Sequence, residues 1–175
     1  EVIKDDSIDK FCRRAYRGGF CYVKSNGKIK TQRHYVYDTN SMYPSMMLGT
    51  IDHNGKKWGG RYPVGKGHYF EGGVPEPDEL YIVHIRCAFE IKPKHIPFIQ
   101  IKATNSPFMP NEYIEDSAGI QDLWLTSVDY TLFHEQYNVY DEEVIDGYTF
   151  ASRTDIFKDY IDIFYEMKDR GKREG

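Results

Sequence analysis

Apolar and polar residues alternate most clearly between residues 80 and 91. A period of two along a segment of this length predicts a half-buried β-strand. One face of the strand is then apolar and the other polar, the two sets being Ile85, Cys87, Phe89 and Ile91, and His84, Arg86 and Glu90.

Shorter apolar runs predict further strands, at residues 20–23, 34–37, 98–102, 123–125 and 143–151. The Asn26-Gly27 pair between the first two runs favours a tight hairpin. Residues 49–78 are rich in Gly and Pro, so we expect a long connection there, with one short strand at 68–70.

Helical spacing of apolar residues predicts four helices. We expect the first over residues 7–14 and the second after a Ser41 cap, with Pro44 in its first turn. Ser127 caps a helix over 128–137, and Thr154 caps the last one, whose polar end at 168–175 is expected to fray. That last helix has one apolar face, formed by Ile156, Phe157, Tyr160, Ile161, Phe164 and Met167. Strands and helices in this order predict an α+β fold.

Composition excludes several classes of protein. A chain of 175 residues that is 40% hydrophobic can bury a core. The odd number of cysteines, Cys12, Cys21 and Cys87, predicts reduced thiols, and the six histidines lack zinc-ligand spacing. No apolar run approaches the roughly 18 residues of a membrane span, and the acidic, polar beginning is not a signal peptide.

Charge is segregated along the chain although the net charge is only −4. Residues 10–34 carry eight basic residues and no acidic one, whereas residues 103–152 have no Lys or Arg and carry ten acidic residues. The first region can bind phosphates. The second suits a basic protein partner, which we expect to contact Glu142 and Glu143. Trp124, between two leucines, is expected in the core.

Asp38 lies where the predicted strand at 34–37 ends and a helix begins. A carboxylate at such a corner can hold Mg²⁺ together with the backbone carbonyl of Thr39, and the N–H groups near Ser41 can bind a triphosphate. The alternative is an ordinary strand–turn–helix with an N-capping Asp or Ser and a buried Tyr43.

Three sequence features resemble those of one enzyme family. Asp38-Thr39-Asn40-Ser41-Met42-Tyr43-Pro44-Ser45 resembles the first polymerase motif of family-B DNA polymerases, with Met42 in place of the commoner Leu. Tyr16-Arg17-Gly18-Gly19 resembles the Tyr-x-Gly-Gly element that joins the exonuclease and polymerase domains. Residues 84–145 resemble the insertion of the protein-primed branch, whose members copy linear genomes of phages and some linear plasmids.

The resemblance implies a role for each matched residue. Asp38 and the Thr39 carbonyl would hold catalytic Mg²⁺, Ser41 and Met42 would line the nucleotide site, and Tyr43 would pack on the deoxyribose and exclude a 2′-hydroxyl. Template DNA would be contacted by Arg13, Arg14, Tyr16, Arg17, Gly18 and Gly19. Glycines in that loop would allow a conformation or close approach that a Cβ would block. Lys102 and Tyr113 would contact the primer or the terminal (priming) protein.

The resemblance also implies an organisation: a linker helix and Tyr-x-Gly-Gly loop at 1–19, a palm hairpin fragment at 20–49, the insertion at 50–153, and the start of the fingers helix at 154–175. Two-metal transfer needs a second carboxylate motif, and Tyr-x-Asp-Thr-Asp-Ser is absent, as are the fingers and exonuclease motifs. We therefore expect a fragment that is inactive by itself, from an enzyme using template–primer DNA and deoxynucleoside triphosphates in a bacterial host cytoplasm.

Two other hypotheses remain open from the sequence. The first is a non-catalytic interaction module, retained in a degenerate prophage, that binds a priming protein or single-stranded DNA. The second is an unrelated aromatic-rich binding domain in which the Asp38 motif is accidental. Burial of Asp38 in a salt bridge would favour the second.

Overall fold

The computed structural model describes residues 5–22, 35–39, 41–51, 53–55, 57–76, 79–100 and 113–174. The chain divides into two units. One consists of Glu1–Cys21 and Gly65–Ala151, and the other of Tyr22–Val64 and Ser152–Gly175. Lys102 and the Asn26-Gly27 turn lie outside the described residues.

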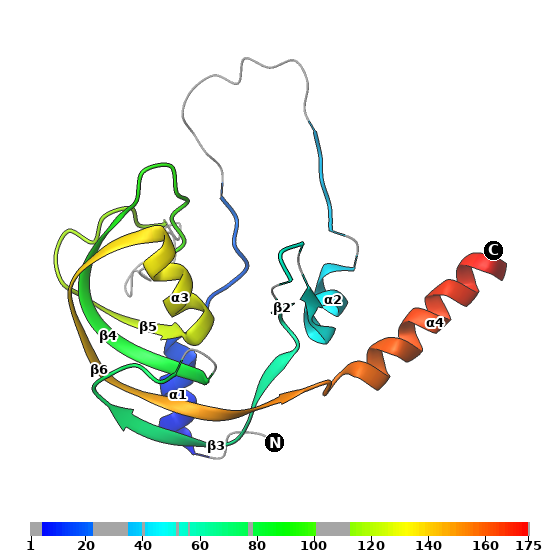
Figure 1. Cartoon of the computed structure of the whole chain (residues 1–175), viewed down its shortest axis with the longest axis horizontal. Helices are drawn as coiled ribbons and strands as arrows, with labels where there is room; N and C mark the ends of the chain where they lie inside the picture. Colours follow the sequence, from blue (N-terminus) through cyan, green and yellow to red (C-terminus); the bar gives the residue numbers. More distant parts are fainter. Residues whose placement is uncertain are drawn as a thin grey trace. The chain divides into compact units, whose positions relative to one another are not determined.

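A curved four-stranded sheet forms the centre of the first unit (Figure 1). Its strands lie in the order β3 (Arg61–Glu71), β6 (Tyr137–Thr154), β4 (Leu80–Ile91) and β5 (Gln121–Thr126), and β4 pairs antiparallel with both β5 and β6. The predicted strands at 80–91, 123–125 and 143–151 are confirmed. So is the α+β class.

The core lies on the face of the sheet that carries the odd-numbered residues of β4. In the antiparallel register, Val83 is opposite Leu125 and Ile85 is opposite Leu123. Phe133 of α3 (Ser127–Gln136) packs edge-on against Phe89, with ring centroids 5.2 Å apart. Burial of each such side chain contributes about 1.5–3 kcal/mol. The buried set is Tyr81, Val83, Ile85, Cys87, Phe89, Ile99, Leu123, Leu125, Phe133 and Tyr137.

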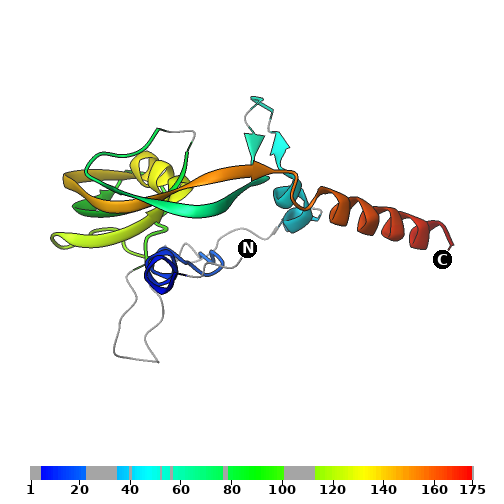
Figure 2. The ribbon, with the colours of Figure 1, turned by 90° about the horizontal axis from the view of Figure 1, so that it is seen from below.

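Helix α1 (Asp6–Arg14) and helix α3 lie on opposite faces of the sheet (Figure 2). The Asp5 carboxylate caps α1, accepting hydrogen bonds from the backbone N–H groups of Ser7 and Ile8 at 2.9 and 3.4 Å. The cap of α3 is Thr126, whose Oγ1 accepts from the backbone N–H of Asp129 at 3.2 Å. The predicted cap at Ser127 is therefore wrong by one residue.

Strand β3 corrects the prediction of a long connection over 49–78. Gly and Pro lowered the apparent strand propensity, but Pro63 and Gly65 are tolerated because β3 is an edge strand. Phe70 of β3 lies directly against Gly147 of β6. A Cβ at Gly147 would lie 2.3 Å from the Phe70 ring and 2.5 Å from the Ile82 carbonyl oxygen, so glycine is required for this close approach.

Three other segments that the sequence predicts as strands are not strands where the structure describes them. Residues 20–22 and 35–37 are not in strands, and Tyr35, Val36 and Tyr37 are exposed. Strand propensity needs a neighbouring strand to take effect, and no described strand pairs with either run. The predicted palm hairpin is therefore not seen among the described residues.

Residues 98–100 are irregular apart from a single bridge between Gln100 and Tyr113. The backbone N–H groups of Phe98 and Ile99 donate to the Tyr137 hydroxyl at 2.9 and 3.2 Å. A buried tyrosine thus replaces the neighbouring strand that the prediction assumed.

The second unit contains α2 (Met42–Leu48), the two-residue strands β1 (Thr50–Ile51) and β2 (Lys57–Trp58), and α4 (Lys158–Glu174). Pro44 lies in the first turn of α2, as predicted. Gly59 and Gly60 both have φ of +69°, and a Cβ at Gly59 would lie 2.2 Å from the Met46 carbonyl oxygen. The glycine pair therefore lets the chain pass directly over α2.

Helix α4 begins later and ends later than predicted. Thr154 is the last residue of β6 and not a cap, and Asp155 with φ of 61° turns the chain before Lys158. The polar residues 168–174, expected to fray, continue the helix. Of the predicted apolar face, Ile161 is buried, whereas Tyr160, Phe164 and Met167 are more than half exposed. Within the described ranges, no helix is both long and apolar enough to cross a bilayer.

Candidate nucleotide and nucleic-acid sites

Asp38 lies in an open segment just before α2. Asp38 and Thr39 are both exposed, and Tyr43 presents 77% of its surface to solvent. The alternative of a buried Tyr43 is therefore wrong. A structural carboxylate in a buried salt bridge would be hidden from solvent, whereas Asp38 is exposed. The oxygens of Asp38 and Thr39 are accessible to a ligand.

Ser41 occupies the N-cap position of α2 but does not act as a side-chain cap. Its backbone is left-handed, with φ of 51°, and its hydroxyl makes no capping hydrogen bond. Ser45 donates from its backbone N–H and from Oγ to the Ser41 carbonyl, both at 3.0 Å. The hydroxyl of Ser41 is thereby left for other partners.

Lys168 of α4 supplies one such partner, since its Nζ donates to Ser41 Oγ at 3.2 Å. The sequence gives no sign of this contact, because Lys168 lies in a polar end expected to fray, 127 residues from Ser41. Spacing indicates only the helix face: Tyr160, Phe164 and Lys168 follow at intervals of four along it. A cavity of about 260 Å³ adjoins this contact, lined by Ser41, Pro44, Tyr160, Ile161, Phe164, Tyr165 and Lys168.

These residues fit a hard cation only in part. Asp38 and Thr39 offer oxygen ligands, which Mg²⁺ prefers. Over the described ranges, however, no group of three or more His, Cys, Asp or Glu side chains could hold a metal ion. Any ion at Asp38 would need further oxygens from a substrate phosphate or from other parts of a polymerase.

The basic residues of the predicted template loop have different surroundings. Arg13 forms an ion pair with Asp9 at 2.5 Å on exposed α1, which raises the pKa of Arg13 through the hydrogen bond to the carboxylate. The Arg14 guanidinium lies over the Trp124 ring, 4.6 Å from its centroid. Tyr16 is exposed, and only Arg17 turns inward.

Gly18 and Gly19 do not need to be glycine for the packing of this chain. Neither has a positive φ, and a Cβ at either would meet no atom of the described residues within 4 Å. The expectation that a Cβ would be blocked is therefore wrong for the chain's own contacts. Close approach of a bound strand remains as a reason for glycine there.

Trp124 corrects a second expectation. It lies on the α1 face of the sheet and not in the core, stacked on the His84 ring with centroids 4.0 Å apart and planes 9° from parallel. His84 in turn lies between two carboxylates, with Nε2 2.8 Å from Asp122 and Nδ1 3.1 Å from Asp146. The Arg14–Trp124–His84 stack ties the end of α1 to β4 and β5.

Part of the predicted acidic contact surface is used inside the unit. Glu142 accepts from the Tyr130 hydroxyl at 2.7 Å and pairs with His134 Nε2 at 2.7 Å. Desolvation opposes ionisation of Glu142, but hydrogen bonds from His134 and Tyr130 outweigh it and lower its pKa. The hydrogen bond to Glu142 is the main reason that the pKa of His134 is raised. Glu143 is exposed.

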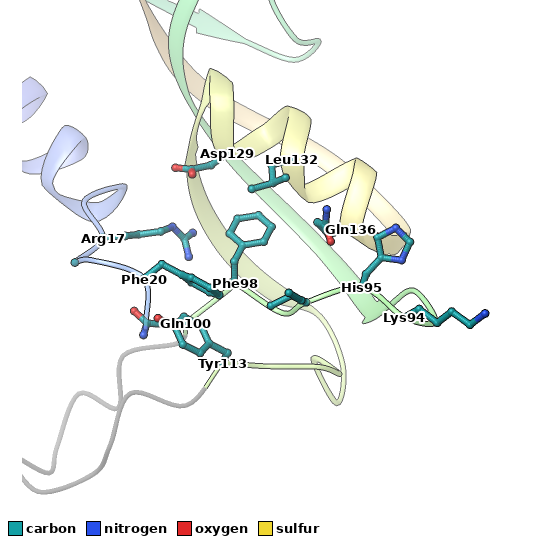
Figure 3. Close-up of a pocket in the computed structure, with 12 residues that line it drawn as sticks. Arg17, Phe20, Lys94, His95, Phe98, Gln100, Tyr113, Asp129, Leu132 and Gln136 are labelled. Carbon is teal, nitrogen blue, oxygen red and sulfur yellow. The ribbon is translucent and has the colours of Figure 1, made fainter. Parts of the chain in front are cut away.

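A larger cavity, of about 590 Å³, brings predicted residues from separate parts of the chain together (Figure 3). Arg17 and Gly18 of the loop share it with Tyr113, which accepts a hydrogen bond at its hydroxyl from the Cys21 backbone N–H at 3.0 Å. Phe20 packs on Tyr113 with ring centroids 4.9 Å apart. The remaining lining residues are Lys94, His95, Ile96, Phe98, Gln100, Asp129, Leu132 and Gln136.

Arg17 is a partly buried charged residue of this cavity. Its Nε and Nη1 atoms are buried and have no hydrogen-bond partner among the described residues. Desolvation lowers the pKa of Arg17, although the negative charge of Asp129 opposes the shift. A desolvated guanidinium without full hydrogen bonding favours an anionic ligand.

The chain is similar to DNA polymerases of phages over nearly its whole length. The DNA polymerase of Bacillus phage phi29 is 41% identical over 165 residues, which is 92% of this chain and 27% of that polymerase. That of Streptococcus phage Cp-1 is 30% identical over 179 residues, covering 97% of this chain and 30% of the relative. The chain thus spans less than a third of these relatives' length.

Solved structures of phi29 DNA polymerase share the fold. The orthorhombic crystal form matches with a TM-score of 0.80 at 39% identity, over 95% of this chain and 28% of that one. The ternary complex with primer–template DNA and incoming nucleotide substrates matches with a TM-score of 0.74 at 41% identity, over 90% of this chain and 26% of that one. The family model described as DNA polymerase type B, organellar and viral, matches residues 2–175. The chain therefore belongs to the organellar and viral type B DNA polymerases.

Proposed function

We propose that these 175 residues are part of a DNA-directed DNA polymerase that begins synthesis on a protein primer. The observation that carries this proposal is the family match over residues 2–175, because the matched range includes the Asp38 motif and the Tyr16-Arg17-Gly18-Gly19 loop. The phi29 polymerase has been solved with primer–template DNA and incoming nucleotides, which supports the same substrates here.

Asp38 and Thr39 are proposed to hold Mg²⁺ in the intact enzyme, together with a carboxylate from another part of the polymerase. The ion would supply charge stabilisation for phosphoryl transfer. In that reaction a hydroxyl oxygen attacks the α-phosphorus of a deoxynucleoside triphosphate, a new P–O bond forms, and pyrophosphate leaves.

Ser41, Met42 and Tyr43 are proposed to position the nucleotide. Tyr43 has the exposed ring that packing on a deoxyribose requires. The contact between Lys168 and Ser41 adds a residue to this site, because an ammonium at the start of α2 can attract the triphosphate.

Arg13, Arg14, Tyr16, Arg17, Gly18 and Gly19 are proposed to follow the template strand through its phosphates, which positions DNA without reading sequence. Lys102 and Tyr113 are proposed contacts to the primer or priming protein. Glu143 is the better candidate for the acidic contact with that protein, since Glu142 is engaged by His134 and Tyr130.

The proposed organisation keeps four parts: the linker and loop at 1–19, the palm fragment at 20–49, the insertion at 50–153 and the start of the fingers at 154–175. The 175 residues alone are proposed to be inactive, because Asp38 has no second carboxylate motif beside it.

The test uses an intact polymerase that contains these residues. Asp38→Asn is expected to abolish Mg²⁺-dependent transfer of the first nucleotide to the priming protein and extension of a DNA primer. Asp159→Asn, an exposed change on α4, is the matched control and is expected to retain both activities. Full activity of the Asp38 variant would contradict the proposal. Binding of the priming protein without incorporation by the unaltered chain would instead indicate an interaction module.

A further inference from the structure

The cavity around Arg17 has the properties of a ligand site and not of a packing defect. Its volume of about 590 Å³ falls within the roughly 300–1,000 Å³ typical of small-molecule pockets. Part of its lining adjoins the core: Phe98 packs on buried Tyr137 with centroids 5.7 Å apart, and Leu132 lies on α3 next to buried Phe133. Other lining residues, such as Phe20 and Ile96, are exposed. The cavity therefore has one side set against the core and another open to solvent.

Aromatic rings form one part of the lining. Figure 3 shows Phe20, Phe98 and Tyr113 around the opening, with Arg17 extending over Phe20 toward Phe98. Flat apolar surfaces of this kind bind nucleobases by stacking, whatever the base, since every base has a π-face. A guanidinium beside them can also stack on a base or bind its phosphate.

Charge narrows the choice of ligand. Among the lining residues, Arg17 and Lys94 are cationic and Asp129 is anionic, so these three side chains give a net charge of +1. A phosphodiester carries one negative charge, which offsets this excess. The desolvated Arg17 guanidinium has two nitrogens without hydrogen-bond partners among the described residues, so it is placed to gain most from such an anion.

The lining also contains two side-chain amides, Gln100 and Gln136. Each amide offers a donor and an acceptor, and base edges present both. An anionic peptide side chain would match the charge but would leave these amides without a specific partner. The chemistry therefore favours a nucleotide over a protein side chain.

We propose that this pocket holds one unpaired nucleotide of single-stranded DNA, with the base among Phe20, Phe98 and Tyr113 and the phosphodiester beside Arg17. This inference rests on the proposed DNA-binding function and extends it. Binding to phosphates along the loop positions the strand, whereas the pocket adds a contact that requires a base. The two contributions can be measured separately.

The experiment compares two fluorescent strands of about 12 nucleotides, oligothymidylate and an abasic strand with the same phosphodiesters. Binding to the purified 175-residue chain is followed by fluorescence anisotropy. We expect oligothymidylate to bind about tenfold more tightly than the abasic strand. Leu132→Trp, which fills the pocket, removes this preference. Val128→Trp, on the exposed side of the same helix, keeps it.

A second variant guards against misfolding of the filled pocket. Gln136→Ala removes one amide without adding volume and is expected to reduce the preference several-fold, with circular dichroism spectra and melting curves of both variants checking the fold. Arg13→Gln lies outside the pocket and is expected to weaken binding of the oligothymidylate and the abasic strand equally.

Three results would overturn the inference. Equal binding of the two strands would leave phosphate binding intact and show that no base enters a pocket. Absence of binding to either strand would contradict DNA binding by this chain altogether. The third result is binding of the peptide acetyl-Phe-Asp-amide that is lost in Leu132→Trp, together with no preference for bases. It would identify the pocket as a protein contact.

Discussion

The sheet unit and the α2–α4 unit place their predicted functional residues in opposite situations. In the sheet unit, Arg17 and Tyr113 line a cavity that adjoins the packed core through Phe98. In the other unit, Asp38, Thr39 and Tyr43 are exposed, and the described part of α4 keeps Tyr160, Phe164 and Met167 largely in solvent. One site adjoins the packed core, while the metal-binding residues proposed for the other lie on an exposed segment.

This difference teaches how the two sites depend on the rest of a polymerase. A pocket whose lining residues all come from the sheet unit can be studied in the 175 residues alone. A carboxylate on an exposed segment gains a defined geometry only from further ligands and neighbouring elements. Binding measurements on the chain itself therefore address the Arg17 pocket, and catalysis must be measured on an intact enzyme.

The largest expected effect is a difference in unfolding free energy between a buried ring of the sheet unit and an exposed ring of the other unit. Phe133→Ala removes a ring with 0% exposure and should lower the free energy of unfolding by about 3–5 kcal/mol, because it leaves a cavity beside Phe89. Phe164→Ala, at a ring that is 54% exposed, should change it by less than about 1 kcal/mol. Urea denaturation followed by circular dichroism measures both. Similar losses for the two variants would mean that α4 is as well packed as the sheet.

Two glycines sharpen the same comparison. Gly147→Ala places a Cβ 2.3 Å from the Phe70 ring and should destabilise the sheet unit by about 1–3 kcal/mol. Gly171→Ala lies in α4, where the new Cβ would meet no atom of the described residues within 4 Å, and it should stabilise that helix by about 0.5–1 kcal/mol. Thermal unfolding of the two variants should therefore shift in opposite directions. A shift in the same direction would contradict the packing described for one of the two sites.

The smallest expected effect concerns the His134–Glu142 pair. Raising the pKa of His134 gives stability that is present below its ordinary value of 6.5 and is lost as pH rises through the raised value. Lowering the pKa of Glu142 gives stability that is present above its ordinary value of 4.5 and is lost as pH falls through the lowered value. The pair thus contributes most between these two ordinary values.

Glu142→Gln should lower the free energy of unfolding at pH about 5.5 by less than about 1 kcal/mol, because both side chains are partly exposed. The difference from the unaltered chain should shrink at pH about 9, where His134 is neutral. Glu143→Gln, at the exposed neighbouring residue, is the control and should give a small difference at both pH values. A Glu142 effect that does not depend on pH would exclude the ion pair as its cause.

Local patterns predicted part of this fold and of its sites correctly. The alternation at 80–91 and the helices near 7–14 and 128–137 were found because each depends on residues close in sequence. The motif at Asp38 led to the correct family for the same reason, since its spacing is contained within eight residues.

Errors arose where a distant contact decides the local structure. Gly and Pro lower the apparent strand propensity of β3, and its pairing beside β6 depends on Gly147, which leaves room for Phe70. Residues 98–100 satisfy their backbone donors with the Tyr137 hydroxyl instead of a strand. Trp124 was assigned to the core from its leucine neighbours, but alternation along β5 places it on the opposite face, against Arg14 and His84.

The sequence by itself determined the family, the segregation of charge and the residues available for chemistry, because motifs and charges are carried by short stretches of chain. Only the tertiary structure decided which of those residues meet. It placed Arg17 and Tyr113 around one cavity and brought Lys168 to Ser41, although 127 residues separate the second pair. Such contacts follow from how strands register and helices pack, which involves the whole unit and cannot be derived from any one segment.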